Sequence, residues 1–537
     1  MISTFHGLEV ARRGMMTQQA ALYTTGHNIA NANTPGYTRQ RVNFTQTEPY
    51  PPASMNRPQI PGQMGTGVKA GDIQRIRDSF TDMQFRTENS KLGYWQAKAE
   101  MLTQMEDVMN EPSDTGLSST LDQFWNALQD LAVQPQNDGA RRVVRERGIS
   151  LANTFNYMSN SLKAIQKDYR NEIDASQQRI NSILRQINAI NKEIGSIEPH
   201  GYLPNDLYDE RDRLIDELSS MMNIRVEVKP SGGLASANAE GIYDIYLATP
   251  QGDKLNEIKL IDAEFGKAIG IQIQYQNPDD LDSPVTYIEF LELNDKEGFA
   301  NSNDVKATLE FSTFNTNGKL KGYIEGYGYK DGADVKGIYN EMLADLDEMA
   351  FEFATKFNEV HQSGWSLNDI REKVQSGLPF FAFGSGITSG DTKGAAASLK
   401  VADEILKDVQ NIAAAAAAAG PDGEAFIGNG SNALNLANVK DIPIDFGVKK
   451  TNVQSFYQGM IGKLGDNASE ALRMTKTAGI LKDSVELRRM SISSVSLDEE
   501  MTNLIKFQHA YNAAARNITM IDEMLDKIIN GMGIVGR

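Results

Sequence analysis

The feature that most constrains the fold of this 537-residue chain is an apolar seven-residue repeat at each of its two ends. Near the amino terminus the repeat consists of Leu8, Met15, Leu22 and Ile29, with Phe5 beside the same stripe. At the carboxyl end it consists of Leu497, Leu504, Tyr511, Ile518 and Leu525, with a second row at Phe507, Ala514, Ile521 and Ile528. Such repeats are typical of helices that pair as coiled coils. We therefore expect both ends to be long helices that bind other helices.

Both terminal helices have recognisable limits. The first is followed by HNIANANTPGYTRQRVNF, residues 27–44, and we expect it to be ended by Asn31, Asn33, Thr34, Pro35 and Gly36. The last opens with Ser496 and, three residues later, Glu499, the spacing of a capping box. Gly531 stands where its C-cap would fall.

An isolated helix with one narrow apolar stripe buries too little surface to offset the entropy lost on ordering its backbone. The two seams also carry polar residues at or beside core positions, namely Arg12, Gln18, Gln19 and Gln508. Polar residues at such positions fix the relative alignment of several neighbouring helices. We therefore expect the ends to fold only when other copies of the chain surround them.

The interior is predicted to be mostly helical from 76 to 222. Tyr169, Ile173, Ser176, Ile180, Ile183, Ile187, Ile190, Ile194 and Ile197 follow a strict 4, 3 spacing, which we interpret as a seam packed against the chain's own helices. Upstream of this seam we expect a helix that begins near Ser113 or Asp114 and ends before Pro135. Downstream of the seam we expect another helix that begins at Asn205 or Asp206.

Period-two alternation in IRVEVKP, YDIYLA, AIGIQIQYQ and VTYIEFLEL predicts an inserted β domain at 226–335. Helical spacing returns from Ile338 to Phe357, and 366–455 is mixed, with an alanine tract at 413–419. The predicted fold is mainly α, elongated and multi-domain, with a coiled-coil end. Its domains are a terminal helical unit (1–45 and 497–537), a helical body (46–225 and 336–496) and the β insertion (226–335).

The composition of the chain excludes several classes of function. The net charge of −18 disfavours nucleic acid and anionic lipid as partners, and the absence of cysteine excludes disulfides and thiolate chemistry. We find no signal-peptide h-region and no stretch of eighteen apolar residues. His6, His27, His200, His361 and His509 have no metal-binding spacing, and Gly65, Gly67 and Gly71 do not follow a strand as a phosphate loop would. Asp279, Asp280 and Asp282 indicate a turn rather than calcium ligands.

Several motifs are similar to those of the axial proteins of the bacterial flagellum. NIANANTPGYTR resembles the stretch that follows the first helix in rod, hook and hook-associated proteins, matched here by Asn28, Ile29, Ala30, Asn31, Asn33, Thr34, Gly36, Tyr37 and Arg39. Four further stretches extend the resemblance toward the hook-associated proteins. They are GTGVKAGDIQRIRDSFTDMQ at 65–84, NEPSDTGLSS at 110–119, NDLYDERDRLIDELS at 205–219, and residues 498–529.

This resemblance implies a structural protein of the hook–filament junction, without catalysis, metal or cofactor. Its implied partners are further copies of the chain, the hook protein FlgE, the second junction protein FlgL and an export chaperone, FlgN, on the carboxy-terminal helix. It would be exported unfolded by the flagellar type III system without a cleaved signal and would lie outside the cell. The expected assembly interface consists of Phe5, Leu8, Met15, Leu22, Asn28, Ile29, Asn31, Thr34, Gly36, Tyr37, Arg39, Leu497, Leu504, Phe507, Tyr511, Ala514, Ile518, Ile521, Leu525 and Ile528.

Other functions stay open at this point. The chain could be another axial or flagellin-like component, a carrier of an enzymatic or adhesive β domain, or a cytoplasmic coiled-coil scaffold. No GxSxG or P-loop motif supports an enzyme.

Overall fold

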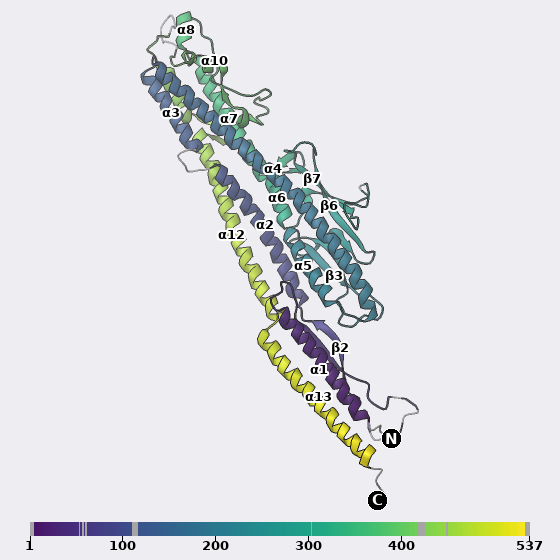
Figure 1. Cartoon of the computed structure of the whole chain (residues 1–537). Coiled ribbons are helices and arrows are strands. Elements are labelled where there is room, and N and C mark those ends of the chain that lie inside the picture. Colours follow the sequence, from purple (N-terminus) through teal and green to yellow (C-terminus); the bar gives the residue numbers. More distant parts are fainter. Residues whose placement is uncertain are drawn as a thin grey trace.

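The chain is an elongated rod with both ends of the chain at the same end of the rod (Figure 1). This computed structural model describes residues 5–52, 54–55, 58, 62–109, 116–301, 303–416, 425–446 and 449–531. The helices are α1 (His6–Ala30), α2 (Ser79–Met109), α3 (Leu117–Val133), α4 (Asp138–Ile197), α5 (Asn205–Met221), α6 (Lys319–Tyr327), α7 (Ile338–Ser363), α8 (Leu367–Glu372), α9 (Ala395–Ser398), α10 (Asp403–Lys407), α11 (Ser431–Ala437), α12 (Val453–Ser493) and α13 (Leu497–Gly531).

The strands form one large sheet and three small ones. They are β1 (Gln40–Gln46), β2 (Val68–Arg75), β3 (Ile224–Lys229), β4 (Ile242–Ala248), β5 (Lys254–Asp262), β6 (Lys267–Tyr275), β7 (Val285–Glu292), β8 (Val305–Glu310), β9 (Tyr329–Asp331), β10 (Asp334–Lys336), β11 (Phe381–Ala382), β12 (Lys400–Val401), β13 (Ile444–Phe446) and β14 (Lys449–Thr451). The large sheet has the order β10-β9-β7-β6-β5-β4-β3, and β8 also pairs with β7.

Two pairs of long helices form the length of the rod. At one end α1 lies beside α13, and further along α2 lies beside α12 (Figure 1). The antiparallel hairpin of β1 and β2 covers another side of α1. It contains a bulge at Asn43 and Phe44, where a Cβ on Gly71 would come within 2.4 Å of Thr45 Oγ1, so the register requires a glycine.

The longest element is α4, whose 60 residues span about 90 Å. Its first turn is capped by Asn137, whose side chain accepts a hydrogen bond from the Gly139 amide at 2.8 Å. Pro135 lies between α3 and α4, as the sequence predicts. At the upper end of the rod α3, α7 and β11 enclose an aromatic core formed by Phe124, Trp125, Phe353, Phe357, Phe380 and Phe381, each at most 3% exposed.

The large sheet lies along α4 (Figure 1), which bonds to its strands through side-chain amides. Asn181 donates to the Ile271 carbonyl and accepts from the Ile271 amide, and Asn191 binds both backbone groups of Tyr243 in the same way. These amides satisfy strand groups that have no partner on β5: Ile271 of β6 lies beyond the short β5–β6 pairing, and Tyr243 of β4 lies beyond the β4–β5 pairing.

The predicted mainly α, elongated fold with a β insertion is confirmed, and 76–222 is mostly helical. The isoleucine seam is buried, but it packs against β6 as well as against helices, because the sheet covers the same side of α4. The helix α5 does begin at Asn205; that side chain, however, donates to the Ile73 carbonyl and does not cap the helix. The region predicted as β contains the helix α6. The division into domains stays a prediction.

The mixed region holds the short elements from α8 to β14. Ala413, Ala414 and Ala415 of the alanine tract are buried, whereas residues 417–419 lie outside the described residues. The same is true of the start signals Ser113 and Asp114.

Candidate assembly site

The two ends of the chain form an antiparallel helix pair with a seven-residue register. A Cβ on Gly7 would come within 3.1 Å of Ile521, and one on Gly14 within 4.0 Å of Ala514. Seven residues along α1 therefore correspond to seven residues back along α13. Side chains of α13 thus lie directly against both glycines, more tightly at Gly7 than at Gly14.

Most of the predicted seam is half-buried inside this pair. The half-buried members are Leu8, Met15, Leu22, Ile29, Leu504, Phe507, Tyr511, Ala514, Ile518, Ile521 and Leu525. Phe507 also meets Phe44 of the hairpin, with ring centroids 5.9 Å apart. Each helix supplies the other with an apolar neighbour within one chain, and the expectation that the ends fold only among copies stays a prediction.

The outer face of α13 carries large apolar side chains that stay exposed. They are Leu497 (48%), Met501 (58%), Ile505 (52%), Met520 (49%), Met524 (55%), Ile528 (46%) and Ile529 (70%). On α1 Met16 and Tyr23 are also exposed, and so is Phe5, which immediately precedes this helix. Of these ten, the seven-residue repeat predicted only Phe5, Leu497 and Ile528. On α13 the sequence signal for the others is a four-residue spacing, from Leu497 through Met501 to Ile505 and from Met520 through Met524 to Ile528.

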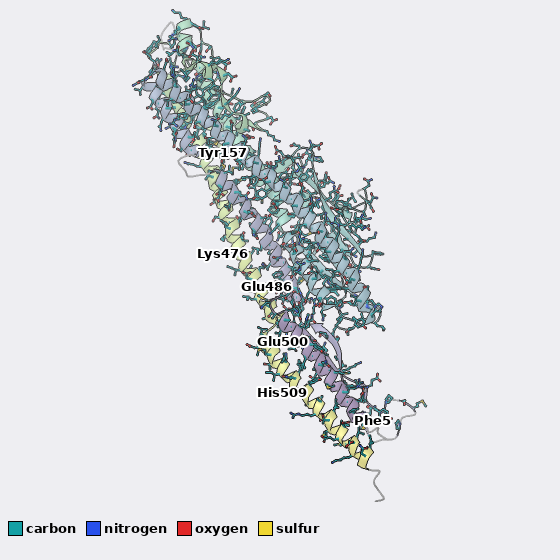
Figure 2. All side chains as sticks on the ribbon, viewed as in Figure 1. Phe5, Tyr157, Lys476, Glu486, Glu500 and His509 are labelled. Atoms are coloured by element: carbon teal, nitrogen blue, oxygen red, sulfur yellow. The ribbon has the colours of Figure 1, made fainter. Side chains whose placement is uncertain are left out.

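The helix pair joins the body at a neck, which we define as residues 28–40, 75–86, 209–216 and 489–500. Figure 2 shows Glu500 at this place. Asn28 is its centre: its amide donates to the Gln40 carbonyl at 2.8 Å and to Glu500 at 3.2 Å, and its oxygen accepts from the Tyr37 hydroxyl at 2.8 Å. Arg39 pairs with Glu500 at 2.8 Å and with Glu499 at 2.6 Å.

These contacts give three predicted site residues a role within the chain. Asn28, Tyr37 and Arg39 fasten the end of α1 to the first turn of α13, and Glu499, predicted as a capping residue, is committed to the ion pair with Arg39. Asn31 and Thr34 form the turn that ends α1, with Thr34 donating to Asn31 at 3.2 Å. Gly36 has φ +83°, a conformation that favours glycine. The predicted end of the first helix is confirmed. At the other end, α13 still includes Gly531, the last described residue of the chain, so this glycine is not a C-cap outside the helix.

A second layer of the neck is a buried cluster of opposite charges. Asp212 of α5 meets three guanidinium groups: Arg75 at 2.8 Å, Arg86 at 3.0 Å and Arg77 at 3.1 Å. The same cluster contains Arg489 of α12, which pairs with Asp82 at 3.1 Å and Asp216 at 2.6 Å, and it extends to Asp209 and Glu240 through Arg75. Four elements, β2, α2, α5 and α12, therefore meet through charged side chains.

Burial on its own raises the pKa of Asp212, but the charges of Arg77, Arg75 and Arg86 outweigh it and hold that pKa well below its usual range. For Asp209 burial is the stronger influence and raises the pKa, although Arg75 opposes it. Tyr37 lies against Asp209, Asp206 and Glu500; burial first and these carboxylates second raise its pKa. The motif-bearing stretches 28–39, 72–84, 205–219 and 498–500 thus converge on one site, although the sequence separates them by up to several hundred residues.

Other residues that the sequence offered as candidate metal ligands are held in structural contacts. Arg170 donates to the carbonyls of Pro278 and Asp280, which holds the turn that contains the three aspartates. His361 is buried and bonded to backbone groups. Within the described ranges, no three His, Cys, Asp or Glu side chains are grouped so that they could hold a metal ion. None of the helices in those ranges has the length and apolar composition needed to cross a bilayer.

Comparisons with known proteins fit this architecture. Residues 8–38 match the model of the flagella basal body rod protein family, and 488–531 match that of the carboxy-terminal region of the flagellar basal body rod FlgEFG proteins. These two segments are the ones that pair at the end of the rod and meet in the neck. The fold and the neck therefore define an axial protein of the bacterial flagellum.

The comparisons also single out one family. Residues 102–381 match the helical domain of the flagellar hook-associated protein FlgK. The chain is 44% identical to flagellar hook-associated protein 1 of Bacillus subtilis strain 168, with all of both chains covered, and 24% identical to that of Escherichia coli K12, with 97% and 98% covered. The chain belongs to the FlgK family of flagellar hook-associated proteins, which are structural proteins of the flagellum.

A solved structure supports the fold. The flagellar hook junction protein FlgK of Burkholderia pseudomallei aligns with a TM-score of 0.57 at 14% identity, covering 77% of this chain and all of that one.

Proposed function

We propose that the outer face of the α1–α13 pair is the surface through which this chain assembles, with its own copies and with neighbouring axial subunits, into the junction between hook and filament. The observation that carries this proposal is the seven large apolar side chains on α13, in one group at 497–505 and another at 520–529, each about half exposed or more. Clustered exposed apolar side chains mark interaction sites on soluble proteins. The inner seam is half-buried within the pair and holds the two helices together.

The partners follow from this placement and from the family. One end of the junction meets the hook protein FlgE and the other the second junction protein FlgL, while FlgN covers α13 before export. A chaperone at this helix would shield the exposed methionines and isoleucines from aggregation. The chain would reach the outside of the cell through the flagellar type III channel, without a cleaved signal. No reaction is assigned to the chain, since its relatives are structural proteins.

The test replaces the apolar face with charge. In a strain whose own gene is deleted, a variant with Met501→Glu, Met520→Glu and Met524→Glu is expected to leave hooks without filaments and to release flagellin into the medium. The purified variant should keep its thermal stability to within about 1 kcal/mol, since exposed substitutions affect folding little.

A matched control is Tyr157→Glu on α4, an equally exposed apolar-to-charged change at a distant position (Figure 2). It should restore swarming like the unchanged chain. Normal filaments in the three-glutamate strain would refute the proposed surface.

A further inference from the structure

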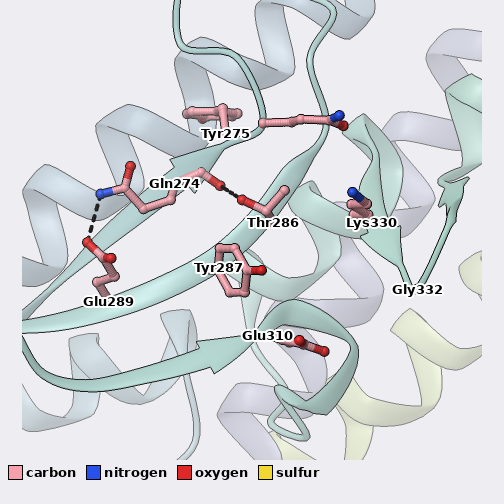
Figure 3. A pocket seen from close by; sticks show the side chains of 9 residues that line it. Gln274, Tyr275, Thr286, Tyr287, Glu289, Glu310, Lys330 and Gly332 are labelled. Carbon is pink, nitrogen blue, oxygen red and sulfur yellow. Dashed lines mark hydrogen bonds between the residues drawn. The ribbon is translucent and has the colours of Figure 1, made fainter.

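The large sheet carries an open cleft where β6, β7, β8 and β9 come together (Figure 3). Its volume is about 500 Å³. That volume lies within the range of about 300 to 1,000 Å³ that small-molecule sites occupy. The cleft is lined by Gln274, Tyr275, Gln276, Thr286, Tyr287, Glu289, Glu310, Lys330 and Gly332. It is far from the α1–α13 pair and has no part in the proposed assembly.

The strand β6, which lines the cleft, is held by α4 on the opposite face of the sheet. The hydroxyl of Tyr275 donates to Asp174 of α4 at 2.9 Å, and the guanidinium carbon of Arg170 lies 4.1 Å from the centre of its ring. Arg170 is itself 7% exposed and fixed by two backbone carbonyls. Since both partners come from the long helix, the ring of Tyr275 cannot turn without breaking them. These contacts fix β6 at the point where it lines the cleft.

The floor presents an aromatic ring to solvent. Tyr287 lies opposite Gln274 on one neighbouring strand and opposite Glu310 on the other, so three side chains share one face of the sheet. Tyr287 is 43% exposed. Beside it the Gln274 amide donates to Glu289 at 2.8 Å, which fixes a planar pair of polar groups next to the ring (Figure 3).

Several polar groups around the ring have no partner within the described part of the chain. These are the side chains of Gln276, Tyr287, Glu310 and Lys330. Together they offer hydrogen-bond donors and acceptors alike. The lining contains two carboxylates and one ammonium, so it does not favour an anion, and it is too polar to favour an apolar ligand.

We propose that this cleft binds a neutral oligosaccharide. A pyranose ring has an apolar C–H face that can lie on the exposed ring of Tyr287, as apolar groups pack on aromatic faces. Its hydroxyl groups both donate and accept, which matches the mixed set of Gln276, Glu310 and Lys330. An exposed ring bordered by planar amide and carboxylate groups provides both contacts at once.

The experiment is saturation-transfer NMR on the full-length protein with maltohexaose, chitotetraose and mannotetraose as probes. At least one of these probes is expected to show transfer to its ring protons. Tyr287→Ala should weaken that binding about tenfold, because the stacking surface is lost, whereas Tyr287→Phe should retain most of it. The matched control, Tyr157→Ala, removes an exposed tyrosine from α4 and should leave binding unchanged.

Circular dichroism of each variant confirms that the sheet is intact. The proposal is overturned if none of the three probes shows transfer, or if the signal of a binding probe is the same in Tyr287→Ala as in the unchanged protein. Neither outcome would bear on the flagellar role, which rests on other elements.

Discussion

At the scale of single residues, Asp212 shows how the neck is fastened. Its carboxylate is buried and lies within 3.1 Å of three arginines that come from β2, from the segment after it and from α2. Charges buried together in this way are strongly interdependent, because removing one leaves the others unpaired in a region of low dielectric.

Asp212→Asn is therefore expected to destabilise the protein by about 3 to 5 kcal/mol. The control is Glu210→Gln on the same helix, which removes only an exposed ion pair with Arg213 and should change stability by less than about 1 kcal/mol. Urea unfolding of both variants measures the difference. Equal, small effects would show that the neck does not depend on this carboxylate.

His361 predicts a pH dependence in the upper part of the rod. Burial lowers its pKa to about 4, and the Ala413 amide donates to Nε2 at 3.0 Å, which requires the neutral ring with its proton on Nδ1 toward the Leu378 carbonyl. In the unfolded chain a histidine binds a proton below about pH 6.5. Between these two values the unfolded state holds more protons, so stability is full above pH 6.5 and falls as the pH is lowered.

From pH 7 to pH 5 this histidine should account for a loss of about 2 kcal/mol. His361→Gln removes that part of the pH dependence. Its difference in unfolding free energy between the two pH values should be smaller than that of the unchanged protein by this amount, whereas an unaltered difference would contradict the assignment.

At the scale of elements, the pairing of α1 with α13 depends on small residues. Gly14→Leu places a large side chain against Ala514 and should force the helices apart, weakening the pair by about 1 to 3 kcal/mol. Gly26→Leu is the matched control on the same helix, because a Cβ there meets nothing within 4 Å, and it should strengthen the helix slightly. Hydrogen exchange over 5–30 and 497–531 should become faster only in the first variant. Faster exchange in both would mean that the close approach at Gly14 is unimportant.

The sequence predicted elements where apolar periodicity was strong. Both terminal seams and the isoleucine seam of α4 were found because one face of each helix is at least half-buried and the seven-residue period follows that face. The helix α12 gave no such pattern, since it buries one face on α2 while Ile480 and Leu487 remain more than 60% exposed on the other. The helix α6 was missed inside the predicted β region because its nine residues are too few for a period to emerge.

The candidate site was predicted only in part, for a similar reason. Spacing identifies residues on one helix, so the inner seam was found. The partners Glu500, Asp212 and Arg489 could not be found in this way, because each bonds to residues from 126 to 472 positions away in the chain. A repeat identifies a face of a helix, but it does not tell which of two adjacent apolar faces is already covered.

At the scale of the whole molecule, the rod consists of a folded body and, at one end, a pair of helices that present apolar side chains to solvent. Among the described residues α13 has one buried side chain, that of Glu500, whereas the upper body contains a continuous aromatic core. The end of the rod is therefore suited to contacts between molecules, and the body to holding that end in a fixed direction through the charged neck.

The central claim is that the outer face of α13 contacts other subunits in the assembled flagellum. A photo-crosslinking residue at Met524 tests it most directly, with the same residue at Tyr157 for comparison. In isolated hook–filament complexes we expect crosslinks from position 524 to a second polypeptide, and none from this position in the purified monomer. If position 524 gives no crosslink between chains in intact flagella, the account is wrong.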